Sequence, residues 1–108
     1  MRFYKYLYVS DSMVKRKKKT VKHLRSGKYP IGTYIIVLIE EGPNQLEFYN
    51  TALLKQKLLD DRRQFVVGLA SGYDDAVYLV EEIVRDVFGN TGDADIRAYI
   101  MKQEGREK

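Results

Sequence analysis

The chain of 108 residues contains no cysteine. Disulfides, thiolate zinc sites, iron–sulfur ligation and a cysteine nucleophile are therefore excluded. Histidine is scarce as well: His23 is the only imidazole, and it lies between basic residues without an obvious acidic partner. We interpret it as a surface residue, and we expect no metal site and no cofactor.

Long apolar runs are also missing. No segment approaches the roughly 20 apolar residues that span a bilayer. Residues 1–10 place Arg2 and Lys5 among alternating aromatic residues, which is unlike the continuous apolar core of a signal peptide. We therefore expect a cytoplasmic protein that does not contact a membrane. With 44% apolar residues, the chain is able to bury the core of one domain.

Charge is distributed very unevenly along the chain. Residues 1–28 contain ten Lys or Arg and one acid, whereas residues 29–108 contain nine Lys or Arg and fourteen acids. The formal net charge of +4 thus conceals a basic first quarter of +9 and an acidic remainder of −5. Such an uneven charge distribution indicates what the protein binds more than how it folds.

Apolar periodicity predicts alternating strands and helices. Strands are expected where apolar and polar residues alternate or where a short run is continuously apolar. Helices are expected where apolar residues recur at helical spacing after a residue that can cap a helix N-terminus. The expected strands are 2–9, 33–39, 46–49 and 65–70. The expected helices are 13–26, 52–59 and 73–88, the last opened by a capping box from Ser71 to Asp74. Residues 94–101 fit either a helix or a strand, with a slight preference for helix.

These elements predict one small α/β or α+β domain over residues 1–102, followed by a frayed polar tail over 103–108. We expect a mixed four- or five-stranded sheet. It would contain a parallel β-α-β first unit, a central hairpin and a second β-α unit, and its order would be ferredoxin-like if the last element is a strand. Two strands without a polar face need cover on both sides. Either the helices lie on opposite faces, or they share one face and a second subunit or the last element covers the other.

The basic segment is the main functional candidate. Five consecutive cations at 15–19 and two further ones cover most of a helix circumference, which is more than one small acidic domain can neutralise. One interpretation is electrostatic contact with nucleic acid. The candidate residues are Lys15, Arg16, Lys18, Lys19, Lys22 and Arg25. The alternative is a solvated helix that also faces an acidic surface, either the helix of residues 74–86 or a partner protein, within the domain or across a homodimer.

Three tyrosines, Tyr4, Tyr6 and Tyr8, share one face of the first expected strand. Exposed aromatic residues on a sheet stack bases in RNA-recognition domains. The basic Gly-aromatic-Gly-aromatic signature of their third strand is absent from residues 45–50. We therefore interpret the tyrosines as core or interface residues.

Enzyme motifs are not found. The segment Gly68 to Gly72 joins a strand to a helix but matches neither the dinucleotide fingerprint nor the P-loop. Asp74 and Asp75 would repel a phosphate at that helix start. If the first and fourth strands are parallel neighbours, the residues at their carboxyl ends form a ligand crevice, where open α/β sheets bind ligands. The crevice residues would be Ser10, Ser12, Ser71 and Gly72.

The sequence thus predicts a small binding or interaction module and no enzyme. Nucleic-acid contact through the basic helix is the leading hypothesis. A homodimeric protein-interaction module, with the basic helix paired to an acidic surface, is the alternative.

Overall fold

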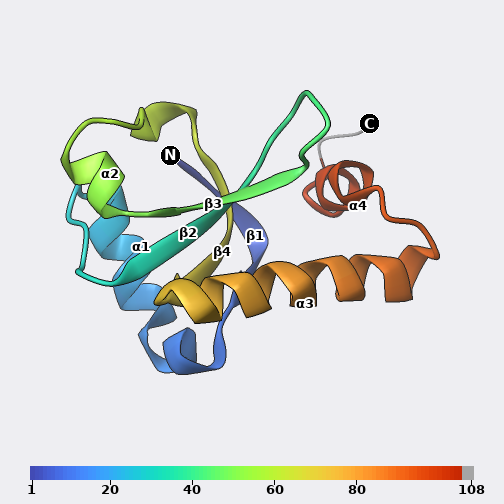
Figure 1. Cartoon of the computed structure of the whole chain (residues 1–108), viewed down its shortest axis with the longest axis horizontal. Coiled ribbons are helices and arrows are strands. Elements are labelled where there is room, and N and C mark those ends of the chain that lie inside the picture. The colour runs from blue at the N-terminus through green and yellow to red at the C-terminus, as the bar shows by residue number, and fades with distance from the viewer. Residues whose placement is uncertain (106–108) are drawn as a thin grey trace.

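The computed structural model describes residues 1–105 (Figure 1). Four strands, four α-helices and two 3-10 helices follow one another in this part of the chain. In chain order they are β1 (Arg2–Val9), η1 (Asp11–Arg16), α1 (Lys17–Arg25), β2 (Thr33–Leu38), β3 (Leu46–Asn50), α2 (Ala52–Lys55), η2 (Asp61–Arg63), β4 (Phe65–Ser71), α3 (Tyr73–Thr91) and α4 (Ile96–Gln103).

The four strands form one mixed sheet in the order β1-β4-β2-β3. β1 and β4 are parallel, whereas β2 is antiparallel to both β4 and β3. The expected single domain of small α+β type, with its β2–β3 hairpin and its β4–α3 unit, is confirmed. The expected parallel β-α-β first unit is wrong, because β4 separates β1 from β2 and the two run in opposite directions.

The central position of β4 follows from its composition. Its residues from Phe65 to Ala70 are all buried, so the strand needs neighbours on both edges and cover on both faces. An irregularity in both ladders lies near the middle of the strand, since the pairing with β2 steps from Val66 to Gly68. Gly68 brings the sheet close to α3: an added Cβ there would lie 3.1 Å from Leu79 Cδ2.

The helices divide between the two faces of the sheet (Figure 1). On one face α3 and α4 bury a core that includes Ile36, Val67, Leu79, Ile83 and Ile100. On the other face η1, α1 and α2 bury a second core that includes Met13, Leu24, Ile35, Leu54 and Leu69. Opposite-face cover is therefore the correct alternative, and the domain needs no second subunit to complete a core.

Two helix starts differ from the sequence expectation, and α2 covers only Ala52–Lys55 of the expected helix 52–59. The first helix begins as 3-10 turns, and regular α-helix starts at Lys17. The capping box is wrong, because Gly72 with φ of 92° precedes α3 and no side chain caps that end. The ambiguous last segment is a helix, capped by the Asp95 carboxylate accepting from the Ala98 N–H, which rules out the ferredoxin-like strand order.

The expected tail begins within the last turn of α4. Gln103 is the last residue of α4, and the Glu104 carboxylate accepts a 3.0 Å hydrogen bond from the Lys5 N–H. Residues 106–108 lie outside the described residues. Within residues 1–105, no helix is both long and apolar enough to cross a bilayer.

Candidate nucleic-acid interface

Three buried side chains fix the orientation of η1 and α1. Met13 and Leu24 are each 1% exposed, and Thr20 is also buried, so this side of the segment faces the sheet. Lys17 and Val21 lie at its margin and are half-buried. Nine other positions from Asp11 to Arg25 are exposed, and six of these nine are Lys or Arg.

All six candidate cations are exposed. Lys18, Lys22 and Arg25 follow the i, i+4, i+7 spacing of one helix face, and Lys19 lies beside them. Lys15 and Arg16 extend this surface along η1. We call these six residues the basic face: Lys15, Arg16, Lys18, Lys19, Lys22 and Arg25.

The basic face has no acidic partner within the described chain. Over residues 1–105 the ion pairs are Arg2–Glu40 and Arg62–Asp60, each at 3.4 Å, and neither involves α1. The acidic α3 covers the other face of the sheet. The interpretation that the basic helix pairs with residues 74–86 inside the domain is therefore wrong.

A shallow hollow runs along the basic face. It has a volume of about 510 Å³ and is lined by Lys17, Lys18, Val21, Lys22, Arg25 and Ser26. The Arg25 guanidinium lies 5.1 Å from the centre of the Phe3 ring, a cation–π contact that ties its position to β1. Lys17 and Phe3 are additions to the residues expected from the sequence, because the lining by Lys17 and the contact of Phe3 depend on how α1 packs against the sheet.

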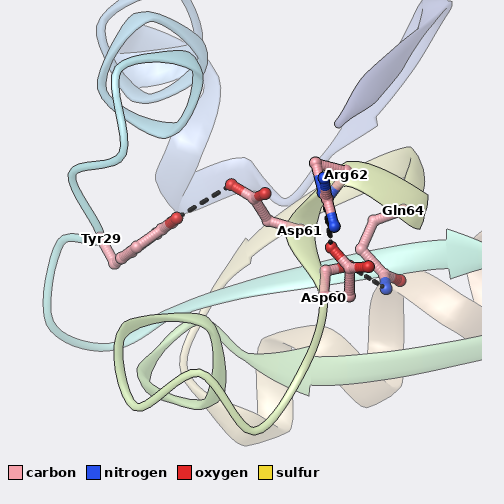
Figure 2. A network of polar contacts seen from close by, with 5 residues as sticks. All are labelled: Tyr29, Asp60, Asp61, Arg62 and Gln64. Atoms are coloured by element: carbon pink, nitrogen blue, oxygen red, sulfur yellow. Dashed lines mark hydrogen bonds and ion pairs between the residues drawn. The ribbon is translucent and has the colours of Figure 1, made fainter.

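The end of α1 is fixed by its own turn. The His23 carbonyl accepts from the Ser26 hydroxyl at 3.0 Å and from the Lys28 N–H at 2.8 Å. Beyond this turn, the Tyr29 hydroxyl donates to the Asp61 carboxylate at 3.0 Å (Figure 2). Burial and this hydrogen bond raise the pKa of Tyr29.

Figure 2 also shows how the segment that receives Tyr29 is held. The Asp60 carboxylate accepts from the Arg62 N–H at 3.0 Å, and the Gln64 side-chain amide donates to the Asp60 carbonyl at 2.8 Å. The Arg62 N–H lowers the pKa of Asp60. The Tyr29–Asp61 hydrogen bond thus joins the loop after α1 to the turn before β4.

The expected serine crevice forms only in part. β1 and β4 are parallel neighbours, which was the condition for a crevice at their carboxyl ends. The Ser10 N–H donates to the Leu69 carbonyl. The Ser10 and Ser12 hydroxyls lie 3.3 Å apart. In contrast, Ser71 pairs with Thr33 in the sheet, and neither Ser71 nor Gly72 lines the hollow of about 300 Å³ beside Ser10 and Ser12.

The chemistry of this hollow is acidic. The Ser12 hydroxyl donates a 2.7 Å hydrogen bond to the Asp75 carboxylate, and Asp11 and Glu82 also line the walls. Three carboxylates disfavour a phosphate or another anion. Within residues 1–105, no group of three His, Cys, Asp or Glu side chains could hold a metal ion.

The three strand tyrosines do not form a base-stacking platform. Tyr4 is 3% exposed in the core beneath α3 and α4, and burial raises its pKa to about 12. Tyr8 is half-buried and bonded to Asp86 of α3. The packing interpretation is confirmed for these two, whereas Tyr6 is exposed.

No protein-family model, no curated protein and no solved structure matches the chain significantly.

Proposed function

We propose that the chain is a small binding module that contacts nucleic acid through the basic face. The observation that carries this proposal is the exposure of six cations without an ion-pair partner in residues 1–105. Like charges at i, i+4 destabilise a helix by about 0.2–0.5 kcal/mol per pair. A polyanion laid along the helix removes that repulsion and releases its own counterions.

The chemistry of the basic face favours contact with phosphates over reading of bases. Lysine supplies four of its six cations, and a lysine ammonium is a point charge that lacks the planar fork by which arginine recognises a base edge. Val21 in the hollow contributes apolar surface and no hydrogen bond donor or acceptor in its side chain. We therefore expect affinity with little sequence preference and a steep dependence on salt.

Fluorescence anisotropy of labelled single- and double-stranded DNA and RNA tests this proposal. We expect micromolar binding and a log–log salt slope near −4 on duplex DNA, since each neutralised phosphate contributes about 0.9. No change in anisotropy at about 50 mM salt would contradict nucleic-acid contact, because electrostatic binding is strongest at low salt.

Competition with polyglutamate distinguishes an acidic protein surface from nucleic acid. Duplex DNA carries one charge per roughly 1.7 Å of its axis, and this density drives counterion release. Polyglutamate at equal total charge should therefore displace the labelled DNA less well than unlabelled DNA does. Equal displacement would favour an acidic protein partner instead.

A further inference from the structure

Strand β3 forms an open edge of the sheet. It pairs only with β2. Two hydrogen bonds at the ends of the hairpin show which backbone groups of β3 point toward β2: the Ile39 N–H donates to the Gln45 carbonyl, and the Thr51 N–H donates to the Thr33 carbonyl. Because antiparallel ladders alternate, the backbone groups of Leu46, Phe48 and Asn50 point away from β2. They present three N–H and three C=O groups to a further strand.

The two edges of the sheet differ in how they are protected. The β3 sequence LEFYN contains no lysine or proline, two residues that protect sheet edges, and Glu47 is its only charged residue. At the other edge, β1 is irregular between Phe3 and Tyr8, and the Glu104 carboxylate occupies the Lys5 N–H. Edge-to-edge addition is therefore open at β3 and obstructed at β1.

Two tyrosines pack against Phe48 of the open edge. The Phe48 ring centre lies 5.5 Å from that of Tyr73 and 6.2 Å from that of Tyr34. Tyr73 remains 60% exposed despite these contacts. On α3 the exposed Val84 and Phe88 follow Tyr73 at spacings of 11 and 15 residues, which places all three on one side of the helix.

We propose that two copies of this chain associate through antiparallel pairing of their β3 strands, with a two-fold axis at Phe48. This register pairs every outward backbone group, since Phe48 lies opposite Phe48 of the other copy and Leu46 lies opposite Asn50. Obstruction of β1 prevents β3 of one copy from adding to β1 of another. The assembly therefore closes as a dimer and does not continue as a filament.

The side chains of β3 fit the same register. Glu47 lies opposite Tyr49 of the other copy, so the only charge of the strand does not meet its like. Within one chain the Tyr49 hydroxyl already donates to the Glu47 carboxylate, and burial together with this bond raises the pKa of Tyr49 to about 12. The hydroxyl has a single proton, so in the dimer it can donate either to Glu47 of its own chain or to Glu47 of the other copy.

The two-fold axis runs perpendicular to the joined sheet and leaves both α1 helices on the same face. Two basic faces would then be available to one polyanion, which increases avidity without a new contact. The dimer itself does not depend on nucleic-acid binding. The five-residue edge is short beside the roughly 800 Å² per partner of stable interfaces, so we expect micromolar association.

Sedimentation equilibrium of the full chain over about 10–500 µM tests the dimer in the affinity range expected for a small interface. The wild type should show a monomer–dimer equilibrium. Phe48→Lys places two like charges on the axis and should weaken association at least tenfold. Tyr78→Lys, at an exposed position on α3 away from this edge, should leave association unchanged. A monomeric wild type throughout the range would overturn the proposal.

Disulfide trapping tests the register without relying on how Phe48→Lys folds. The chain has no native thiol, so Phe48→Cys supplies one reactive group per copy. Directly opposed residues of a hydrogen-bonded pair lie about 5.5 Å apart at Cα, within the range of a disulfide. Mild oxidation should link Phe48→Cys into dimers much faster than Tyr78→Cys. Equal rates for the two variants would contradict this register.

Discussion

The Tyr8 hydroxyl donates a 2.7 Å hydrogen bond to the Asp86 carboxylate, which joins the edge strand β1 to α3. Hydrogen bonds to charged groups contribute about 1.5–3 kcal/mol when buried. Because this pair is partly exposed, we expect Tyr8→Phe to lower the free energy of unfolding by about 1–2 kcal/mol in urea denaturation at pH 7. Tyr6→Phe is the matched control on the same strand, and an equal loss there would argue against a specific role for the Tyr8 bond.

Tyr8 should also make the stability of the domain depend on pH in the alkaline range. Burial and the hydrogen bond to Asp86 raise the pKa of Tyr8 well above its usual value of 10. The unfolded chain therefore ionises first, so the stabilisation by Tyr8 is complete below pH 10 and is lost as the pH rises toward the folded pKa. The stability difference between wild type and Tyr8→Phe should shrink by about 1.4 kcal/mol per pH unit above pH 10. A constant difference from about pH 8 to 11.5 in urea denaturation would contradict this pKa.

Gly68 lies where α3 packs closely against β4, and this close packing leaves little room for a side chain. A Cβ at this position would lie 3.1 Å from Leu79 and 3.3 Å from Ile36, inside the core beneath α3. We expect Gly68→Ala to destabilise the domain by about 1–3 kcal/mol through overpacking. Gly89→Ala adds the same methyl group to an exposed helical position with open space around it, and it should stabilise by about 0.5–1 kcal/mol. Opposite signs in thermal denaturation are the expected result, and equal effects would contradict it.

Arg97 anchors the loop between β2 and β3. Its guanidinium donates to the carbonyls of Ile39, Gly42 and Asn44. Arg97→Ala should lower the unfolding free energy by about 2 kcal/mol and accelerate hydrogen exchange in residues 39–45. Arg97→Lys should not restore protection, because one ammonium cannot reproduce the planar fork. Full protection in Arg97→Lys would show that charge alone holds the loop, and Arg85→Ala on exposed α3 is the control.

The order of elements was predictable from the sequence because periodicity and turn residues act locally. The β2–β3 hairpin is local and was expected, but the position of β4 between β1 and β2 was not, because it joins segments far apart in the chain. A usable signal was nevertheless present: residues 33–39 and 65–70 are both continuously apolar, whereas Arg2 and Lys5 interrupt the first strand. Two strands that both need central positions are best placed side by side, with the interrupted strand at an edge.

The candidate site was likewise only partly predictable from the sequence. The exposure of the basic face was predictable, because six cations cannot all be buried or paired with acids in a small domain. The contact between Arg25 and Phe3 and the lining of the hollow by Lys17 depend on how α1 packs against β1. Ser10 and Ser12 line one hollow together, whereas Ser71, which pairs with Thr33 of β2, does not line it.

The most direct test of the account compares two triple variants in the salt series on duplex DNA. Lys18, Lys19 and Lys22 changed to Gln remove three charges from the basic face, and Lys55, Arg63 and Lys102 changed to Gln remove three exposed charges elsewhere. If the basic face holds the phosphates, the slope of the first variant becomes less negative by about 2–3, whereas the slope of the second stays close to the wild-type value. Equal slopes for the two variants would show that binding follows net charge alone and would contradict a site on α1.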